Sequence, residues 1–341
     1  MVFAEKLIAW QRRHGRRSLP WQGTRDPYRV WLSEVMLQQT QVSAVIPYYE
    51  RFLRRFPTIE ALASASEDEV LQLWSGLGYY ARGRNLHAAA KAVVAMGSFP
   101  RKAEGIEALP GIGKSTAAAI AAFAFGERAA ILDGNVKRVL ARYYGIPGWP
   151  GEKSVETALW ERANRLLPKS GIETYTQALM DLGATVCTRN APRCDACPVR
   201  TGCQARKAGQ TAQIPAPRPR KALPQKAVTW LVLLDQGQLL LEKRPAPGIW
   251  GGLWSFPEAP AKDIDGHCRR SLGCEVRSTK TLETLEHGFT HFRLRIHPLL
   301  CQVARAPNAQ SPGSLWVDID EVSEAAVPAP VRTLVSRLNV A

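Results

Sequence analysis

The sequence predicts a multidomain protein with an all-α region over residues 1–205, a linker over 206–226 and an α+β domain over 227–341. Three observations predict this division. Helix signals recur through the first region without the alternating runs that are typical of strands. Beyond residue 226 the apolar pattern shifts towards a period of two. Between them, the run 214–221 mixes prolines with basic residues, which prevents a regular helix and keeps the segment solvated.

The helices of the first region are marked by their ends. Asp26 followed by Pro27 is typical of a helix N-terminus. Ser66 with Glu69 forms a capping-box pattern, and glycines stand where several helices should end. We expect helices over residues 28–41, 42–56, 70–74, 82–96, 114–126, 135–144, 153–167 and 174–184.

The second region combines strands with two helices. Gln236-Gly237 forms a turn between two apolar runs, and the stretch 291–296 alternates apolar and polar residues. We expect strands over residues 228–234, 239–242 and 291–296, and helices over 264–272 and 331–338.

The formal net charge of +15 is distributed unevenly. Residues 1–225 carry 32 Lys and Arg against 18 Asp and Glu, whereas residues 226–341 carry 13 against 12. A polyanionic partner such as a nucleic acid explains an excess confined to one region better than a requirement for solubility does. No early apolar run has the length of a signal peptide or membrane span, so we expect a cytoplasmic protein with no membrane association.

A glycine-rich turn lies immediately before the expected helix 114–126. Gly111 and Gly113 let backbone N–H groups approach closely and point the same way, and the following helix N-terminus favours an anion. A lone carboxylate, Asp133, follows between an apolar pair and a glycine. A phosphate-binding turn followed by a placed carboxylate suggests chemistry on a nucleic acid.

Four of the seven cysteines fall within seventeen residues, at Cys187, Cys194, Cys197 and Cys203. In a reducing compartment this clustering favours metal binding over disulfides. Gaps of six, two and five residues suit a four-thiolate iron–sulfur cluster, because zinc sites usually pair two short cysteine hairpins. Zinc remains the alternative, since the Cys194–Cys197 spacing also occurs in zinc sites.

Two sets of motifs indicate a family. The segments Leu109–Ala117 and Ile131–Val136, with the four-cysteine spacing, resemble the helix-hairpin-helix DNA glycosylases that carry a [4Fe–4S] cluster. Within that superfamily, Trp31–Val42 and Gly76–Arg82 closely resemble the MutY-type adenine DNA glycosylases. The resemblance extends across nearly the whole chain.

The resemblance implies both an architecture and an activity. Residues of about 19–130 would form the helix-hairpin-helix lobe, and residues 1–18 with 131–205 would form the lobe that holds the [4Fe–4S] cluster. The enzyme would bind double-stranded DNA as a monomer and excise adenine opposite 8-oxoguanine, or more slowly opposite guanine, leaving an abasic site.

Glu34 and Asp133 are the candidate catalytic carboxylates. Glu34 lies in an apolar helical segment, where desolvation raises a carboxyl pKa towards that of a general acid, although a surface glutamate is the alternative. Asp133 could stabilise the positive charge that builds on the sugar, or it could simply cap the next helix. The resemblance implies that Glu34 protonates adenine, that Asp133 stabilises the cation or forms a transient adduct, and that Asn135 holds the site's geometry.

The residue at position 115 distinguishes two reaction types. The resemblance implies that relatives which also cut the DNA strand carry a lysine here, which attacks the sugar as an amine. This chain has Ser115, and Lys114 lies about 100° away around the helix. We therefore expect a monofunctional glycosylase, with Lys114 and Ser115 contacting DNA.

Base extraction leaves a gap in the duplex that the protein has to fill. The resemblance implies that Gln39 and Tyr79 are the wedging residues. A core aromatic packed beside Trp74 and Tyr80 is the alternative for Tyr79.

The C-terminal domain resembles the Nudix-like domain of the same family, which recognises 8-oxoguanine on the opposite strand. The family's recognition loop reads Phe-Ser-His, and this chain has Phe289, Thr290 and His291. The expected helix 264–272 lacks the paired glutamates that bind magnesium in Nudix hydrolases, so nucleotide hydrolysis is not expected. The Trp250–Trp254 run also resembles the family, although a structural turn with aromatic packing accounts for it.

Two alternatives remain at this point. A bifunctional glycosylase and lyase for oxidised pyrimidines would share the helical region but is disfavoured by Ser115 and by the C-terminal domain. A catalytically silent DNA-lesion binder would keep the basic region and the cluster but lose a carboxylate, whereas both Glu34 and Asp133 are present.

Overall fold

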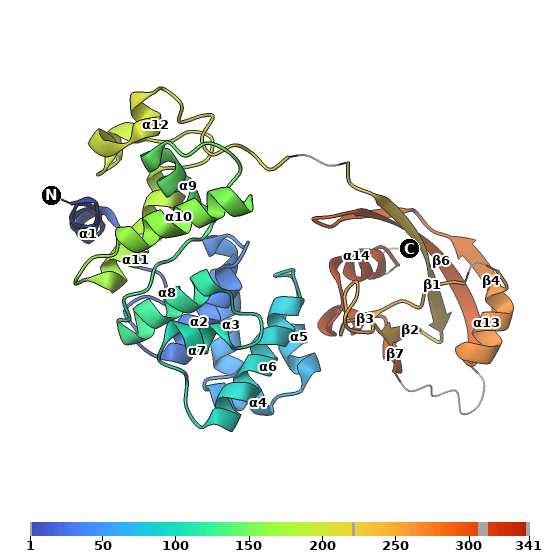
Figure 1. Ribbon diagram of the computed structural model, residues 1–341. Coiled ribbons are helices and arrows are strands. Elements are labelled where there is room, and N and C mark those ends of the chain that lie inside the picture. The colour runs from blue at the N-terminus through green and yellow to red at the C-terminus, as the bar shows by residue number, and fades with distance from the viewer. Residues whose placement is uncertain (1, 220–221, 261, 306–312, 339–341) are drawn as a thin grey trace. The chain divides into compact units, whose positions relative to one another are not determined.

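The computed structural model describes residues 2–219, 222–260, 262–305 and 313–338 (Figure 1). The chain forms two compact units, each made from two separate stretches. Unit 1 comprises Met1–Ser64 and Asn85–Arg220, and unit 2 comprises Ala65–Arg84 and Lys221–Ala341. Within the described residues, no helix combines the length and the apolar composition needed to cross a membrane.

Unit 1 is helical, and no strand occurs among its described residues, as the sequence predicts. Its helices are α1 (Phe3–His14), α2 (Pro27–Leu37), α3 (Val42–Arg55), α4 (Ile59–Ser64), most of α6 (Ala81–Met96), α7 (Ala103–Glu107), α8 (Lys114–Phe125), α9 (Gly134–Tyr144), α10 (Lys153–Arg165), α11 (Ile172–Asp181) and α12 (Gln204–Lys207). A π-helical turn over Leu182–Val186 extends α11. Short 3-10 turns follow over Cys194–Ala196 and Arg200–Gly202.

The expected helix ends are confirmed by their capping contacts. Asp26 accepts a hydrogen bond from the backbone N–H of Tyr28 at 2.9 Å, which caps α2. α8 ends at Gly126, whose φ of 68° is the left-handed conformation that glycine adopts most easily. Because α8 is rich in alanine and its alanines are buried, neighbouring helices approach it closely.

Two expected helix ends in unit 1 differ from the structure by three residues or more. α2 ends at Leu37 and not at residue 41, because Gln39 has a φ of 57° that no right-handed helix can include. The regular part of α11 ends at Asp181, and the wider π-helical turn carries the chain to Val186. Both deviations lie beside the carboxylates described below.

One apolar cluster of unit 1 joins its two ends in sequence. α1 packs against α11 through Phe3 and Leu7, together with buried residues of α9 and α10 (Figure 1). The N-terminal helix and the cysteine-bearing segment therefore share this part of the core.

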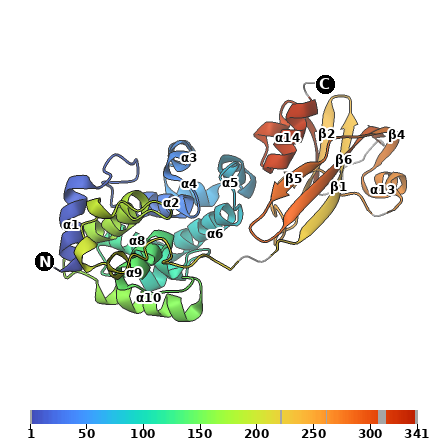
Figure 2. The ribbon, with the colours of Figure 1, turned by 90° about the horizontal axis from the view of Figure 1, so that it is seen from above.

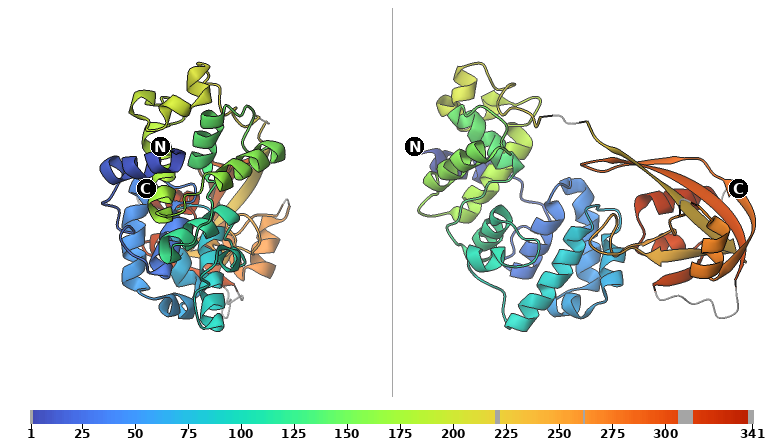
Figure 3. Two further views of the ribbon diagram at one scale, coloured as in Figure 1. Left: turned by 60° about the vertical axis from the view of Figure 1, so that its left-hand side comes forward. Right: turned by 45° about the vertical axis from the view of Figure 1, so that its right-hand side comes forward.

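Unit 2 contains a mixed sheet, so the expected α+β class is confirmed. The strand order is β3-β2-β1-β6-β4, with β5 paired to β6 and β7 paired to β2. β1 and β6 run parallel and side by side (Figure 3). The strands are β1 (Gln225–Asp235), β2 (Gln238–Lys243), β3 (Trp254–Ser255), β4 (Cys274–Thr281), β5 (Leu285–Gly288), β6 (Arg293–Arg305) and β7 (Ser314–Asp318). Unit 2 also includes the helices α5 (Glu67–Trp74), α13 (Ile264–Ser271) and α14 (Ala329–Leu338).

The sheet is covered on both faces. Along β1, Trp230 and Val232 belong to one apolar cluster with residues of α14, whereas Leu231 and Leu233 belong to another with Cys268 of α13 (Figure 2). This alternation explains why β1 reads as a continuous apolar run. The sequence did not predict β4, β5 or β7, because their exposed positions dilute the apolar alternation.

Candidate active site

Glu34 of α2 and Asp133 at the start of α9 line one cavity of about 570 Å³ in unit 1. Gln39, Ser115 and Asn135 line the same cavity. Five of the predicted site residues, taken from three separate segments of the sequence, are therefore brought together.

Asp133 caps a helix and faces the cavity at the same time. Its Oδ1 accepts a hydrogen bond from the N–H of Val136 at 2.8 Å. Burial raises the pKa of Asp133, while the N–H groups of Val136 and Asn135 and the charge of Arg138 act to lower it. The two interpretations of Asp133, helix cap and functional carboxylate, are therefore compatible.

Glu34 has a different environment. Burial and, to a lesser degree, the charge of Asp133 raise the pKa of Glu34 to about 8. Like charges close together cannot both ionise readily, and the donors around Asp133 favour its anion. At neutral pH this arrangement holds a proton on Glu34, while the N–H groups and the guanidinium around Asp133 oppose the effect of its burial.

Ser115 and Lys114 have separate roles in the fold. The hydroxyl of Ser115 accepts a hydrogen bond from the N–H of Leu132 at 2.8 Å and faces the cavity. The Nζ of Lys114 lies 4.6 Å from the centroid of the Trp160 ring, and Lys114 is not among the residues lining that cavity. The structure therefore orients the amine away from the two carboxylates.

Arg138 was not identified from the sequence. Its Nη2 donates to Asn135 Oδ1 at 2.8 Å and to the Gly183 carbonyl at 2.7 Å, and its Nε donates to the Cys187 carbonyl at 2.7 Å. The guanidinium thus fixes Asn135 and ties α9 to the first cysteine.

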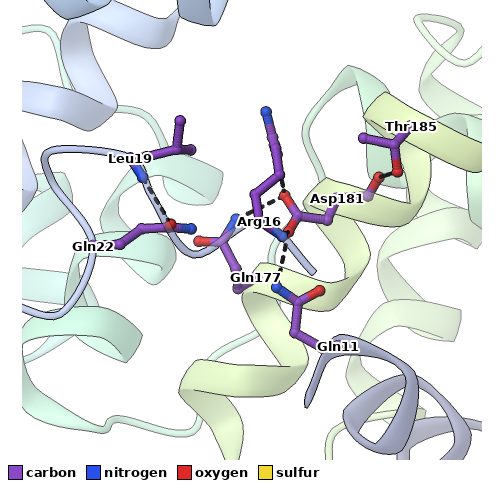
Figure 4. Close-up of polar contacts among 7 residues, drawn as sticks. All are labelled: Gln11, Arg16, Leu19, Gln22, Gln177, Asp181 and Thr185. Atoms are coloured by element: carbon purple, nitrogen blue, oxygen red, sulfur yellow. Dashed lines mark hydrogen bonds and ion pairs between the residues drawn. The ribbon is translucent and has the colours of Figure 1, made fainter. Parts of the chain in front are cut away.

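A second cavity of about 510 Å³ lies on another side of Glu34, and Arg16, Trp21 and Gln177 line both cavities. Arg16 and Gln177 both contact Asp181, which is 0% exposed (Figure 4).

Asp181 organises the wall between the two cavities. Its carboxylate accepts hydrogen bonds from Gln11 Nε2 at 2.8 Å, Arg16 Nε at 2.8 Å and Gln177 Nε2 at 3.0 Å (Figure 4). The backbone N–H of Arg16 also donates to it at 2.9 Å. A carboxylate inside a predicted apolar helix was the available sequence signal, the same one that singled out Glu34.

The glycine-rich turn before α8 is exposed at both glycines. Gly111 has a φ of 74°, and a Cβ there would lie 2.5 Å from Asn85 Cβ. Nothing lies within 4 Å of a Cβ built on Gly113, the N-cap of α8. The turn requires glycine at 111 for conformation and space, and presents open backbone at 113.

The four clustered cysteines line one small cavity with Arg142 and Arg193. Arg142 Nη1 lies 3.4 Å from the sulfur of Cys187, and the Cys203 thiol donates to the Arg142 carbonyl at 3.3 Å. Burial raises the pKa of the Cys197 thiol to about 11. Among the described residues, no group of three or more His, Cys, Asp or Glu is placed to hold a single metal ion. The shared cavity, with four sulfurs and cationic neighbours, fits a thiolate-bound cluster.

Tyr79 of unit 2 is 45% exposed and has a φ of 50°, so it is not the core aromatic that the alternative interpretation requires. Arg82 lies beneath the loop, with its guanidinium carbon 5.5 Å from the Tyr79 ring centroid. The same guanidinium donates to the carbonyls of Leu77 and Gly78 at 3.2 Å each. The loop thus presents an aromatic ring on a braced backbone.

Phe289, Thr290 and His291 form the turn between β5 and β6. Phe289 stacks on Phe292 with ring centroids 4.4 Å apart. Thr290 and His291 are exposed, and the Thr290 hydroxyl lies 3.4 Å from His291 Nδ1. The turn leaves both polar side chains available for a ligand.

Two family models match the chain, one over most of its helical region and one over its sheet domain. A family model of the HhH-GPD superfamily base excision DNA repair protein matches residues 32–165, and a NUDIX domain model matches residues 229–337. A solved thermostable thymine-DNA glycosylase is 30% identical with a TM-score of 0.54, covering 60% of this chain and 95% of that one. An endonuclease III in complex with DNA, 21% identical with a TM-score of 0.51, covers 61% of this chain and 99% of its own, and shows the same fold.

Two curated relatives extend the similarity to nearly the full chain. The adenine DNA glycosylase of Buchnera aphidicola subsp. Baizongia pistaciae is 36% identical, covering 99% of this chain and 97% of that protein. The human adenine DNA glycosylase is 34% identical, covering 97% of this chain and 73% of the human protein. With both domains matched and the similarity covering nearly the full chain, the chain belongs to the adenine DNA glycosylase family of base excision repair.

Proposed function

We propose that this protein hydrolyses the N-glycosidic bond of adenine opposite 8-oxoguanine, and more slowly opposite guanine, in double-stranded DNA. The observation that carries the proposal is the pair of carboxylates in one cavity, with the pKa of Glu34 raised to about 8. We also propose that the protein acts as a monomer in the cytoplasm, where it meets DNA.

The chemistry divides between the two carboxylates. Glu34 donates its proton to a ring nitrogen of adenine, which makes the base a better leaving group. As the bond breaks, positive charge develops on the sugar, and the anion of Asp133 stabilises it or forms a transient covalent adduct. Asn135, held by Arg138 at 2.8 Å, keeps the approach to Asp133 fixed.

Adenine has to leave the base stack to reach this cavity. The N–H groups after Gly111 and Gly113, with Lys114 and Ser115, would hold the DNA backbone beside it. Gln39 and Tyr79 would fill the vacated space, and both have the left-handed backbone that projects a side chain from a tight turn. Phe289, Thr290 and His291 would contact 8-oxoguanine on the opposite strand.

Three duplexes test the proposal under single-turnover conditions, with adenine opposite 8-oxoguanine, adenine opposite guanine, and an oxidised pyrimidine opposite guanine. We expect the first to be processed fastest and the third not at all. Because Ser115 replaces an amine nucleophile, strand breaks should appear only after alkali is added. Breaks without alkali, formed as fast as the base is released, would instead indicate a bifunctional enzyme, and binding without base release would indicate a silent lesion binder.

We propose that Cys187, Cys194, Cys197 and Cys203 bind a [4Fe–4S] cluster. The support is their spacing, their shared cavity and the position of Arg142, and a cluster would hold the surrounding basic loops in place near DNA phosphates. Protein purified without oxygen should contain about four irons and four inorganic sulfides per chain. Cys197→Ser should lower both and weaken duplex binding. One zinc per chain in the unaltered protein would support the alternative site.

A further inference from the structure

The turn Trp250–Leu253 of unit 2 receives a segment from a distant part of the chain. Arg84 donates from Nη1 to the carbonyl of Gly251. At Gly252, where φ is 82°, a Cβ would lie 2.9 Å from Glu67 Oε1 and 3.2 Å from Leu71 Cδ1. The turn therefore requires glycine at 252, because the side chains of residues 65–84 lie directly against its backbone.

Further contacts join this segment to the sheet domain. Leu71 is 0% exposed and belongs to the apolar cluster that contains Trp230 and Trp250. Ser75 is buried, and its hydroxyl donates to the Val327 carbonyl at 3.0 Å. Two independent polar contacts, from Ser75 and from Arg84, thus supplement an apolar one.

The segment fixed in this way, residues 65–84, contains the Tyr79 loop. Trp74 Nε1 donates to the Gly78 carbonyl at 3.2 Å, and Arg82 braces the same carbonyl. Ser75 and Arg84 stand just before and just after this loop. The loop is therefore held at both ends by the C-terminal stretch of unit 2.

Trp250 also faces the other functional element of unit 2. Its ring centroid lies 5.5 Å from that of Phe289 and 5.5 Å from that of His287. A continuous set of contacts consequently runs from Phe289 through Trp250 and Gly251 to Arg84.

We propose that Ser75 and Arg84 are positioning residues that hold the Tyr79 loop in register with Phe289–His291 through the Trp250–Leu253 turn. The residue that enters the duplex, Tyr79, and the residues that contact the lesion, Phe289–His291, then move together. Tyr79 is therefore inserted most effectively when the opposite base is 8-oxoguanine. The inference rests on the proposed function, and it adds a structural origin for the preference between the two opposite bases.

The full-length Ser75→Ala/Arg84→Ala variant tests the proposal. We expect single-turnover adenine excision to fall at least tenfold opposite 8-oxoguanine but less than threefold opposite guanine. A 2-aminopurine beside 8-oxoguanine reports unstacking, and its fluorescence rise on binding should fall to the level of Tyr79→Ala. Arg84→Lys should restore most of the selectivity of an Arg84→Ala variant, because lysine can still donate to a single carbonyl.

Arg337→Ala is the matched control, because it removes an exposed arginine of unit 2 that takes no part in the contacts of the Trp250–Leu253 turn. Arg337 instead forms an ion pair of 2.8 Å with Glu283. It should leave both rates unchanged. A selectivity ratio within twofold of the unaltered protein would overturn the proposal, as would equal losses on both substrates. If the double variant does not fold, the ratio of the excision rates opposite 8-oxoguanine and opposite guanine is measured on Ser75→Ala instead, and the same criterion applies. A lack of selectivity in the unaltered protein would contradict the proposed function instead.

Discussion

Asp133→Asn should abolish adenine release while duplex affinity stays within about tenfold, or roughly 1.4 kcal/mol. Asparagine preserves the volume and the helix cap, because its Oδ1 can still accept the N–H of Val136. Only the negative charge facing the sugar is lost. We expect a fall of at least about a thousandfold in the single-turnover rate, as removal of a preorganised electrostatic group typically produces.

Asp26→Asn provides the matched control, because Asp26 caps α2 in the same unit without lining the cavity of Glu34 and Asp133. Its excision rate should match that of the unaltered protein. Base release and duplex binding that declined together in Asp133→Asn would show that the carboxylate only maintains the fold.

Glu34→Gln should reduce excision by about a hundredfold to ten-thousandfold, the range that general acid catalysis contributes. The pKa of Glu34 is raised to about 8, so the proton is present below pH 8 and is lost as the pH rises through it. The rate of the unaltered protein should therefore be level from pH 6 to 7.5 and fall about tenfold per pH unit above pH 8. The residual rate of the variant should lack this decline.

The raised pKa of Glu34 also predicts that Glu34→Gln is more stable than the unaltered protein at pH 8. A carboxyl whose pKa is raised on folding binds a proton that the unfolded chain has released, so stability decreases as pH rises from 4.5 towards 8. Glu34→Gln removes this penalty and should melt at a higher temperature than the unaltered protein at pH 8, with the difference vanishing near pH 4. Glu173→Gln, at the neighbouring cavity, is the control. It should keep the fall in rate above pH 8 and should show no gain in melting temperature that grows from pH 4 to pH 8. A rate that stays level through pH 9 would contradict the role of Glu34 as the acid.

The sequence predicted the elements whose signals are local. Asp26, Ser66 and Gly126 mark helix ends through contacts with residues two to five positions away, and these ends are confirmed. The end of α2 was missed because the left-handed turn at Gln39 leaves no mark on side-chain periodicity. The exposed strands β4 and β7 were missed because pairing with a partner strand, and not burial, defines them.

The candidate site was predictable to the extent that each residue carried its own signal. Glu34 was a candidate as a charge in an apolar helix, but only the family resemblance favoured it over a surface glutamate, and the structure places it in one cavity with Asp133. Arg16, Arg138 and Asp181 were not identified, because their importance lies in contacts that span up to 170 residues of sequence. A helical period indicates which face is apolar but not which distant element covers it, and residues 65–84 are the clearest example.

The position of residues 65–84 within unit 2 has a consequence for synthesis. During translation this stretch leaves the ribosome well over a hundred residues before Trp230, Trp250 and Val327, the residues that cover Leu71 and bond Ser75. Until then the buried neighbours of Leu71 in that cluster have not been synthesised, so its apolar side chain can associate with non-native partners. The enzyme should therefore gain its braced Tyr79 loop as one of the last steps of folding, and a chain truncated at the linker would retain its carboxylates but never complete that loop.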